Sequence, residues 1–381
     1  MLGRQKCSPP YDAGHGGCMS AINDALSKLC VTLGFETPMS ISILVEDPGA
    51  ANFAAGMLGA LKEHGAVTVH ARGAGASQLG SLGVCFQSLG DPFDARCFLE
   101  SAKPSLVVLG TSEDTDAAAH MLVVACREAG IATIGIIDGP ANTASRFRGD
   151  GPDALEYAPD RIFAPSVTVR DTLVDLGYSE DRINVVPHPH FVAVAEQREI
   201  LSRDGKEVLR RRLFPEAGDR PVLVFLAERS GGLDPDQFCR THDYTLVGRG
   251  GEQRRTHIVL EEVLDSVGRA DIVPYIVLRL HPKNDADEFA SYQTEFDMVS
   301  REENALEVCF GADIVVGLTT ILLVEAAVLG TQVLSVVPRE VERHWLLDAP
   351  TGPISCFWKR DELAGALEEA LRSHVKQALP K

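Results

Sequence analysis

One carboxylate stands alone in the most apolar stretch of the chain. Glu325 is the only ionisable side chain in the run IVVGLTTILLVEAAVLGTQVLSVVP. Burying an isolated carboxylate is costly unless a hydrogen-bonding partner compensates it, so Glu325 is either paired inside the fold or held for a ligand. We interpret it as a ligand-binding group. A carboxylate suits the neighbouring hydroxyls of a sugar.

The residues before Glu325 indicate where such a ligand would lie. The pattern DIVVGL is typical of a buried strand, Thr319 and Thr320 favour a helix start, and ILLVEAAVL followed by Gly330 is typical of the helix itself. A strand, turn and helix in this order direct N–H and O–H groups to one point, where a phosphate could bind. The pattern predicts a nucleotide site formed by Thr319, Thr320 and Glu325.

Polar residues also follow two other expected strands in the same half. In YIVLRLHPKND, Arg279, His281 and Lys283 occupy alternate positions, so their side chains should project to one side. Arginine and lysine can neutralise a phosphate, and histidine can donate a hydrogen bond to it or to a leaving group. The alternative is a salt-bridged strand end with a structural histidine. After PVLVFLAE, Ser230 lies in a turn whose amides could contact phosphate, although a flexible loop would have the same composition.

The first half of the chain offers candidates for acid–base chemistry. The strand-like run ISILVED is followed directly by PGAAN. Gly49 would let a ligand approach the backbone, and Asn52 either contacts an acceptor substrate or caps the following helix. Asp138 ends the apolar run IATIGIIDG, where a carboxylate could act as a general base or simply bond to its own loop. Asp47 is the rival base at the same edge.

Cysteine and histidine follow none of the common zinc patterns. The N-terminal set comprises Cys7, His15, Cys18 and Cys30. His188 and His190 in VVPHPHF have HxH spacing, but no third ligand with suitable spacing accompanies them, and we interpret the segment as a hinge. The nine cysteines include no CxxC pair and are expected to be reduced thiols. The sequence predicts neither a metal nor a bound cofactor.

The elements that must position these residues come in two series. From residue 41 onward, short β-branched runs alternate with helical stretches, which is the pattern of βαβ units around a parallel sheet. One series covers residues 36–195 and the second covers residues 196–381, with a charged segment at the junction. Residues 1–35 are expected to be a loosely attached or disordered extension. The sequence predicts an α/β protein of two Rossmann-like doubly wound domains that face each other across a cleft.

Composition narrows the classes of partner. The 381 residues carry a net charge of −18, which argues against a sequence-independent grip on nucleic acid. No apolar run approaches the roughly 20 residues that a membrane-spanning helix requires. The start of the sequence lacks the hydrophobic core of a signal peptide, so we expect a cytoplasmic protein without a membrane span. The sequence leaves the oligomeric state open and is compatible with a homodimer.

Together these patterns resemble the GT-B glycosyltransferases, a superfamily with two facing Rossmann-like domains. The segment PDRIFAPSVTVRDTLVDLGYSEDRINVVPHPHF is similar to the end of their first domain. The resemblance implies that residues 36–195 bind the acceptor and that residues 196–381 bind the nucleotide part of the donor. By the same resemblance, Thr319, Thr320 and Glu325 belong to the donor site.

The pair His281 and Pro282 also resembles the HP motif of bacterial sialyltransferases and CDP-alditol transferases. In those enzymes an acidic element before a glycine supplies the base, and IDG puts Asp138 in that role. We therefore expect an inverting, metal-independent glycosyltransferase that moves a sugar from a nucleotide sugar to an acceptor hydroxyl. The alternatives are a nucleotide-sugar 2-epimerase or hydrolase of the same fold and a non-catalytic nucleotide-sugar-binding protein. The epimerase ranks second because VEDPGAAN lacks a basic residue.

Overall fold

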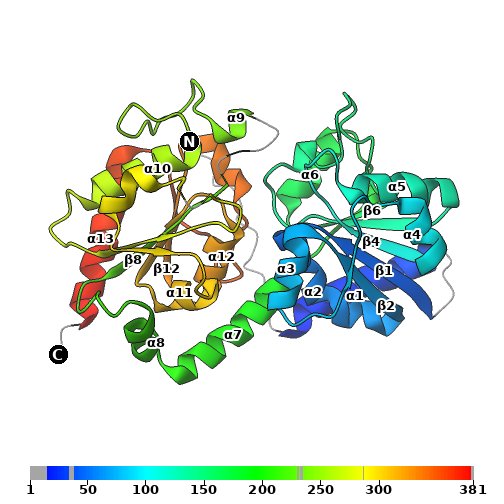
Figure 1. Cartoon of the computed structure of the whole chain (residues 1–381), viewed down its shortest axis with the longest axis horizontal. Coiled ribbons are helices and arrows are strands. Elements are labelled where there is room, and N and C mark those ends of the chain that lie inside the picture. The colour runs from blue at the N-terminus through cyan, green and yellow to red at the C-terminus, as the bar shows by residue number, and fades with distance from the viewer. Residues whose placement is uncertain (1–14, 34–37, 230, 232–234, 286, 379–381) are drawn as a thin grey trace, which may run out of the picture. The chain divides into compact units, whose positions relative to one another are not determined.

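The computed structural model describes residues 15–33, 38–229, 231, 235–285 and 287–378. The chain divides into two compact units, an N-terminal unit that ends at Ala193 and a C-terminal unit that begins at Val194. Each unit is an α/β structure with one parallel sheet (Figure 1). The expected cleft depends on how the units are placed relative to one another, and it stays a prediction.

The N-terminal unit contains a seven-stranded sheet with the order β3-β2-β1-β4-β5-β6-β7. The first part of the unit comprises α1 (His15–Leu33), β1 (Met39–Val45), α2 (Pro48–His64), β2 (Gly65–Ala71), α3 (Gly73–Ser81), β3 (Gln87–Ser88), α4 (Ala95–Ala102) and β4 (Leu106–Gly110). The second part comprises α5 (Ala118–Ala129), β5 (Ala132–Ile136), η1 (Thr143–Ser145), β6 (Arg161–Ala164), α6 (Val167–Asp175), η2 (Glu180–Arg182) and β7 (Ile183–Val185). The helix α7 (His190–Asp204) contains the boundary between the units.

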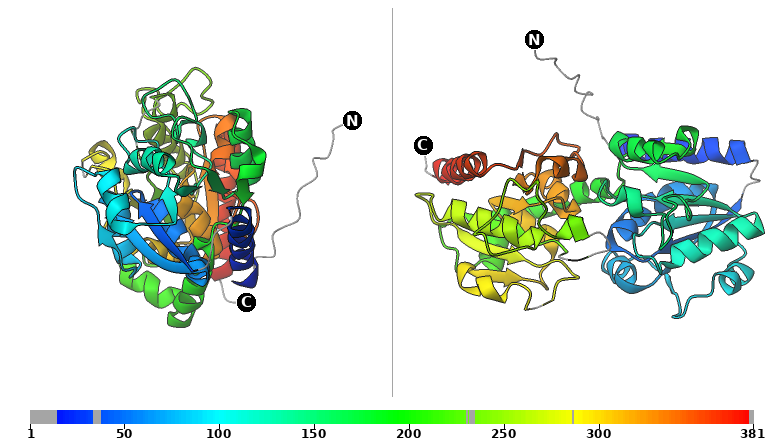
Figure 2. Two further views of the ribbon diagram at one scale, coloured as in Figure 1. Left: turned by 90° about the vertical axis from the view of Figure 1, so that its right-hand side faces the viewer. Right: turned by 90° about the horizontal axis from the view of Figure 1, so that it is seen from above.

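Alternating side chains of the strands build a core on each face of this sheet. Ile41 and Ile43 of β1 pack in the cluster that includes α1, α2 and α3, whereas Leu44 packs in the cluster with α4 and α5. Because both faces are covered, β1 is buried at every position except Ser40. Figure 2 shows the helical layers from two further directions. The expectation of helices on both faces is confirmed.

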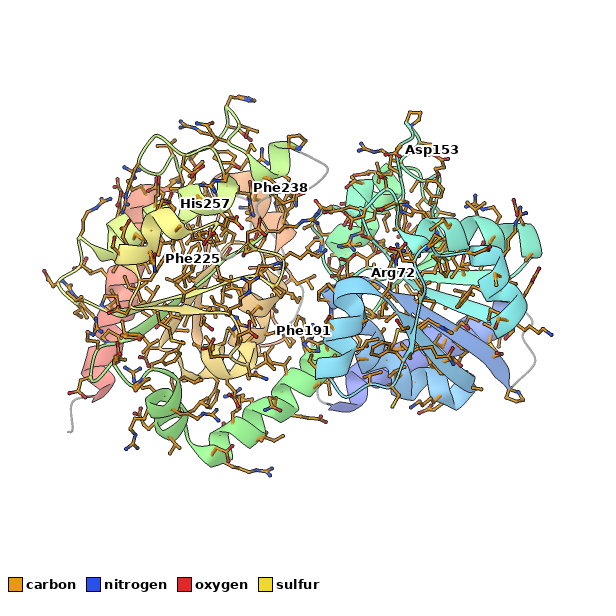
Figure 3. All side chains as sticks on the ribbon, in the orientation of Figure 1. Arg72, Asp153, Phe191, Phe225, Phe238 and His257 are labelled. Carbon is orange, nitrogen blue, oxygen red and sulfur yellow. The ribbon has the colours of Figure 1, made fainter. Side chains whose placement is uncertain are left out.

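The C-terminal unit repeats this plan with six parallel strands in the order β10-β9-β8-β11-β12-β13. Its first elements are α8 (Lys206–Leu213), β8 (Val222–Leu226), α9 (Pro235–Phe238), α10 (Arg255–Val267), β9 (Tyr275–Arg279), η3 (Ala290–Glu295) and β10 (Met298–Ser300). The remainder are α11 (Ala305–Gly311), β11 (Ile314–Gly317), α12 (Ile321–Val328), β12 (Gln332–Val336), η4 (Glu340–Trp345), β13 (Cys356–Phe357) and α13 (Arg360–Ala378). Phe225 of β8, labelled in Figure 3, is fully buried in the core against α10 and α13.

Residues 15–33 differ from the loosely attached or disordered extension that was expected for residues 1–35. Residues 15–33 form the helix α1, in which Ile22 and Leu26 are fully buried against the first sheet. Asn23 of α1 donates a hydrogen bond of 3.0 Å to Glu63 of α2. The apolar spacing i, i+4 of Ile22 and Leu26 explains this helix, because it places both side chains on one face.

In the described segments, no helix combines the length and the apolar composition that are needed to cross a membrane.

Candidate functional site

Both sheets reverse their strand order next to their first strand. In the N-terminal unit β1 lies between β2 and β4, and in the C-terminal unit β8 lies between β9 and β11. Open α/β sheets bind ligands at the carboxyl ends of the strands that flank such a reversal. The side chains that follow these strands are therefore the candidates for a functional site in each unit.

Glu46 follows β1 and holds together three segments of the N-terminal unit. Its carboxylate accepts a hydrogen bond from Arg72, which directly follows β2 and is labelled in Figure 3. Its other oxygen accepts from the backbone N–H of Ala119 in α5 at 3.2 Å. The Arg72 guanidinium also donates to the backbone carbonyl of Asp116 at 3.3 Å. A carboxylate–guanidinium pair thus lies at the strand reversal of this unit.

A second pair of this kind follows β5. The Nη1 atom of Arg146 lies 2.8 Å from Oδ1 of Asp138, and the two side chains are 12% and 25% exposed. The same Nη1 donates to the backbone oxygen and the hydroxyl of Thr111 at 3.1 and 3.3 Å. The His120 Nε2 atom lies 3.0 Å from the carbonyl oxygen of Arg146. Arg146 therefore fixes Asp138 against the end of β4.

Gly49 lies directly against this carboxylate. A Cβ atom added at Gly49 would overlap Oδ2 of Asp138. The two residues were singled out separately from the sequence, and the fold brings them together at the first turn of α2. The partial positive charge at a helix N-terminus favours a carboxylate at this position.

Asp47 and Asn52 occupy different environments in the same region. Asp47 is the N-cap residue of α2 with an extended backbone conformation. Asn52 is 7% exposed, and its Oδ1 accepts a hydrogen bond of 2.7 Å from Gln78 of α3. This bond ties α2 to α3, so Asn52 has a packing role in the structure. Its predicted contact with an acceptor stays a prediction.

Glu228 is the corresponding acid of the C-terminal unit and lies two residues beyond β8. Its carboxylate accepts from the backbone N–H of Thr319, which follows β11, and lies 3.3 and 3.4 Å from the Thr319 hydroxyl. Nη1 of Arg255, at the start of α10, donates to Glu228 at 2.7 Å, and Nη2 donates to the Thr319 hydroxyl at 3.2 Å. The Thr319 groups predicted to bind phosphate are thus engaged by a side chain of the protein.

Arg255 also connects Glu228 to a second buried acid. Its Nε donates to Glu342 at 2.6 Å, and Arg339 donates to the other oxygen of Glu342 at 2.8 Å. Glu342 is fully buried, and the Arg255 side chain is 4% exposed. Burial alone would lower the pKa of Arg255, but the Glu342 and Glu228 carboxylates outweigh this effect and raise it. The four side chains form a chain of alternating charges that we call the edge network, consisting of Glu228, Arg255, Glu342 and Arg339.

Arg279 at the end of β9 and the residues just after the strand do not converge in the way that their spacing predicted. Arg279 is directed to the neighbouring edge strand, where Nη1 donates to the Ser300 hydroxyl at 2.9 Å and to the Glu303 carbonyl at 2.8 Å. Lys283 is exposed. Of the three, His281 is linked to the edge network through Asn284, which accepts from the His281 backbone N–H at 2.8 Å and donates to the Glu228 carbonyl at 3.1 Å.

The hydrogen bonds of His281 define its protonation. Its Nδ1 accepts from the backbone N–H of Lys283 at 3.0 Å, so the neutral ring carries its proton on Nε2. Burial lowers the pKa of His281, and the charge of Glu228 opposes this shift. A neutral histidine with a donor at Nε2 suits a hydrogen bond to a ligand oxygen.

The remaining predicted donor-site residues lie on or near α12. Thr320 is the N-cap residue, as predicted, and its hydroxyl accepts from the Leu322 N–H at 3.3 Å. Glu325 is 6% exposed and lies near the buried Cys309. Burial raises the pKa of the Cys309 thiol, and the Glu325 charge adds to this effect. The roles of both residues in donor binding stay predictions, and Ser230 lies outside the described residues.

His188 and His190 lie at the start of α7, next to aromatic side chains. In the described segments, no group of three or more histidine, cysteine, aspartate or glutamate side chains is arranged to hold a metal ion. His188 is instead packed between Phe53 and Phe191, with ring centroids 4.8 and 5.0 Å away. The segment begins α7, and His188 Nδ1 accepts from the His190 N–H at 3.3 Å.

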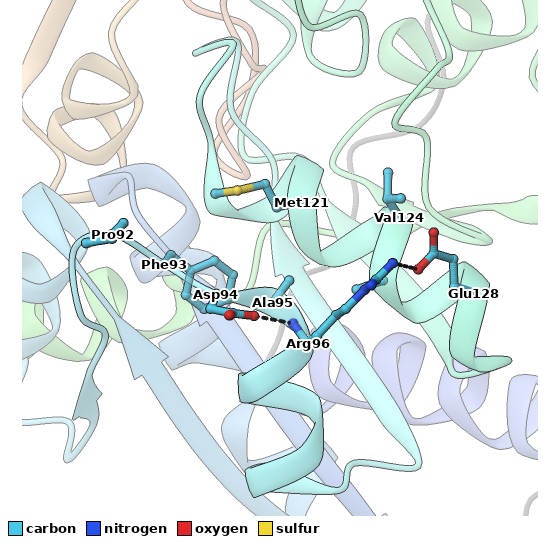
Figure 4. Close-up of a pocket in the computed structure, with 9 residues that line it drawn as sticks. Pro92, Phe93, Asp94, Ala95, Arg96, Met121, Val124 and Glu128 are labelled. Atoms are coloured by element: carbon cyan, nitrogen blue, oxygen red, sulfur yellow. Dashed lines mark hydrogen bonds and ion pairs between the residues drawn. The ribbon is translucent and has the colours of Figure 1, made fainter.

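A surface hollow of about 420 Å³ lies elsewhere on the N-terminal unit, between α4 and α5 (Figure 4). Phe93, Met121 and Val124 form its apolar lining, and the ion pair between Arg96 and Glu128 crosses it at 2.8 Å. None of the residues predicted for the functional site lines this hollow.

Sequence reasoning missed the side chains that organise both sites. Glu46 and Glu228 each stand directly or almost directly after an apolar strand, and that position was a signal that could have revealed them. Arg72 also follows a strand end. Arg146 and Arg255 gave no local signal, because their partners are distant in the sequence.

Comparison with solved structures finds chains of the same architecture along most of the length. A UDP-GlcNAc 2-epimerase from Neisseria meningitidis bound to UDP-GlcNAc matches with a TM-score of 0.58 and 14% identity, over 89% of this chain and 99% of that one. The UDP-GlcNAc 2-epimerase of Methanocaldococcus jannaschii matches with a TM-score of 0.55 and 15% identity, over 90% and 93%. Anabaena HepE in complex with UDP-glucose matches with a TM-score of 0.56 and 12% identity, over 89% and 91%.

The fold is of the GT-B type. The UDP-GlcNAc 2-epimerases share this fold with glycosyltransferases, so the predicted fold class is confirmed as two Rossmann-like units. No protein-family model matches the sequence, and no curated protein matches it. The resemblance of the HP motif to sialyltransferases therefore has no family match to support it.

The prediction of a glycosyltransferase is wrong on these findings. The structures similar to this chain include several nucleotide-sugar 2-epimerases, which favours the alternative that the sequence placed second. The prediction failed because the two classes share one fold and the sequence argument rested on short motifs. The predicted transfer of a sugar to an acceptor hydroxyl by an inverting mechanism is therefore wrong as well.

Proposed function

We propose that this protein is a nucleotide-sugar epimerase that acts on a UDP-linked sugar without a second substrate. The likeness in fold to UDP-GlcNAc 2-epimerases, one of them bound to UDP-GlcNAc, supports this class of substrate. UDP-GlcNAc is accordingly the first substrate to test. The observation that carries the proposal within this chain is the presence of two carboxylate–arginine pairs at the carboxyl edge of the N-terminal sheet.

These pairs supply the feature whose absence counted against an epimerase. The loop VEDPGAAN contains no basic residue, but Arg72 lies against Glu46, which precedes the loop turn. Arg146 lies against Asp138, which in turn contacts the position of Gly49. Two arginines from distant parts of the sequence thus place guanidinium donors beside this loop, each paired with a carboxylate. Guanidinium groups in fixed positions can stabilise negative charge that develops in a reaction.

Epimerisation at a carbon that bears hydrogen can proceed by removal and return of a proton. Such chemistry requires a general base and a general acid near the reacting carbon. Asp138 is the candidate base, because its side chain remains 25% exposed while Arg146 and the start of α2 fix its position. Glu46 and Asp47 are the other carboxylates at the same edge. His281 would donate from Nε2 to an oxygen of the nucleotide in the C-terminal unit.

The direct test is an incubation without acceptor. Purified protein is mixed with UDP-GlcNAc, UDP-GalNAc or UDP-glucose, and the products are separated by ion-exchange chromatography and identified by proton NMR. The proposal predicts that at least one UDP-sugar yields its epimer at constant total UDP-sugar. Formation of free sugar and UDP would instead identify a hydrolase of the same fold.

Two results would contradict the proposal. One is binding of UDP-sugars without any turnover, which would identify a non-catalytic binding protein. The other is turnover only after an acceptor is added. For a variant of the candidate base Asp138, the matched control is Asp171→Asn, because Asp171 is 62% exposed on α6 and pairs with its neighbour Arg170, which is not a predicted site residue.

A further inference from the structure

The carboxylate of Glu228 lies among hydrogen-bond donors that would suit a bound anion. The backbone N–H of Thr319 and the guanidinium of Arg255 both donate to it, and the Thr319 hydroxyl lies 3.3 Å away. After β9, Asn284 donates to the backbone carbonyl of Glu228 at 3.1 Å and accepts from the backbone N–H of His281 at 2.8 Å. The segments after β9 and β11 and the start of α10 therefore meet at Glu228.

The donors are fixed by bonds that do not involve Glu228. Arg255 is held through Nε by Glu342, which Arg339 also binds, and the Arg255 guanidinium lies 5.5 Å from the ring centre of Trp345. His281 is held by the Lys283 N–H and by the bond from its own N–H to Asn284 at 2.8 Å. The donors would therefore remain in place if the Glu228 carboxylate rotated away. Groups positioned in advance bind a ligand with less loss of conformational entropy.

The position of this cluster coincides with the strand reversal of the C-terminal sheet. Glu228 follows β8 and Thr319 follows β11, which are the two strands that flank the reversal. Ligands of doubly wound sheets bind at this place. The carboxylate therefore occupies the position at which an anionic ligand of this unit would be expected.

We infer that Glu228 is an internal competitor for the anionic part of the ligand, a carboxylate that fills a diphosphate-binding position and must leave it when a nucleoside diphosphate binds. The inference rests on the proposed function and adds a control element to the same site. A phosphate oxygen would replace the Glu228 oxygen at the Thr319 N–H and at Nη1 of Arg255. The Glu228 carboxylate and a phosphate cannot share these donors without a large cost in free energy, because like charges in contact repel strongly at a site shielded from water.

The charge balance of the edge network agrees with this exchange. Within the edge network, Glu228 and Glu342 balance Arg255 and Arg339. A bound phosphate would take over the compensation of Arg255 as Glu228 leaves. The Glu228 side chain is 14% exposed, whereas Glu342 is fully buried, so Glu228 is the acid that can turn toward solvent.

The test compares ligand affinities of the full-length wild-type protein with those of two variants. Glu228→Gln removes the charge but keeps the side-chain length. Glu252→Gln is the matched control, since Glu252 also binds a guanidinium, that of Arg254 at 2.6 Å, but has no bond to Thr319. Isothermal titration calorimetry with UDP measures binding of the diphosphate, and titration with uridine measures binding of the nucleoside alone.

We expect Glu228→Gln to bind UDP about tenfold more tightly than wild type, because a competing negative charge is removed. Its affinity for uridine should be unchanged, and Glu252→Gln should resemble wild type with both ligands. Weaker or unchanged UDP binding by Glu228→Gln would overturn the inference, as would an equal gain for UDP and uridine. Failure of wild type and variant alike to bind UDP would overturn the proposed function as well.

A second variant keeps the test decisive if Glu228→Gln does not fold. Glu228→Asp preserves the charge but withdraws the carboxylate from Thr319 by one methylene group. We expect it to bind UDP more tightly than wild type and less tightly than Glu228→Gln. Thermal unfolding followed by circular dichroism checks that each variant is folded. UDP affinity of a folded Glu228→Asp variant equal to that of wild type would contradict the inference.

Discussion

The carboxyl edges of the two sheets share one local arrangement of side chains, but they differ in how the charges of these side chains are connected. In each unit a glutamate follows the first strand of the sheet, Glu46 after β1 and Glu228 after β8. Each accepts from an arginine and from a backbone N–H beyond the strand on the other side of the reversal, that of Ala119 or that of Thr319. This similarity follows from the shared strand order, because in each sheet the connections from the two strands at the reversal lead away from each other and leave a gap at their carboxyl ends.

The two edges differ in how their charges are connected. The N-terminal edge has separate pairs, and the Asp138 side chain remains 25% exposed. The C-terminal edge has a continuous edge network, in which Glu342 is fully buried. A partly exposed carboxylate can reach a substrate and exchange a proton, whereas a fully buried carboxylate held by two guanidiniums, as Glu342 is, is costly to disturb. We infer that the N-terminal edge carries the chemistry and that the C-terminal edge holds the nucleotide.

The largest expected effect is on the stability of the C-terminal unit. Glu342→Gln removes a buried charge between two guanidiniums and should destabilise this unit by about 3 kcal/mol. Trp345 and Trp358 are the only tryptophans of the chain, and both belong to this unit, so urea unfolding followed by tryptophan fluorescence reports on it alone. Glu340→Gln is the control, since the Glu340 side chain is 62% exposed. A loss below about 1 kcal/mol, the size expected for a surface pair, would refute the contrast between the edges.

The next effect concerns catalysis at the N-terminal edge. Asp138→Asn should reduce the turnover number for UDP-GlcNAc by at least about 100-fold, because amides are poor proton acceptors and a general base typically contributes this much. The fold should survive, since the side chain is not fully buried. Steady-state kinetics with Asp171→Asn as control provide the measurement. Wild-type turnover in Asp138→Asn would move the chemistry away from Asp138.

A smaller loss is expected when Asp138 is displaced without being replaced. In Gly49→Ala the new methyl group would push the Asp138 carboxylate away from Arg146, and we expect turnover to fall about tenfold. Gly139→Ala is the matched control, because a Cβ at Gly139 meets open space. Thermal unfolding of both variants checks that each is folded. Equal turnover in both variants would show that the position of Asp138 is not critical.

The smallest effect is a dependence of stability on pH. Burial, with a smaller contribution from His190, lowers the pKa of His188 well below its ordinary value. The unfolded chain therefore binds a proton below about pH 6.5 that the folded chain excludes. This stability is fully present above that pH and is lost as the pH falls, by up to about 1.4 kcal/mol per pH unit.

Urea unfolding followed by far-ultraviolet circular dichroism between pH 8 and pH 5 tests this expectation. The variant His188→Phe, whose ring would fit between Phe53 and Phe191, should reduce the pH dependence of the free energy of unfolding. An identical pH profile for His188→Phe and wild type would exclude His188 as the cause.

The architecture could be predicted because strands and helices follow from local patterns in the sequence. Apolar runs such as ISILV and DIVVG became β1 and β11, and the threonines before ILLVEAAVL gave the N-cap Thr320. The contact between Asp138 and Gly49 also follows from local information, since both residues end or follow parallel strands and such ends share one edge.

The contacts that define the site could not be predicted in this way. Arg255 reaches Glu228 across 27 residues and Glu342 across 87 residues. No periodicity or turn signal links such positions, because their proximity is created by the packing of α10 beside the strand ends. Arg279 shows the converse, since its place in an alternating pattern predicted a shared side but its length let it turn to Ser300. The prediction of the reaction class failed for a similar reason, because short motifs do not distinguish between enzymes that share one fold.

The most direct test of epimerisation by proton removal is to measure the exchange of a substrate proton with solvent. Wild-type protein is incubated with UDP-GlcNAc in D₂O without any acceptor, and the sugar is followed by proton NMR and mass spectrometry. We expect deuterium to enter at C2 of the sugar as the epimer forms, and Asp138→Asn to lose this exchange. Turnover that leaves C2 fully protonated, or that begins only when an acceptor alcohol is added, would contradict this expectation.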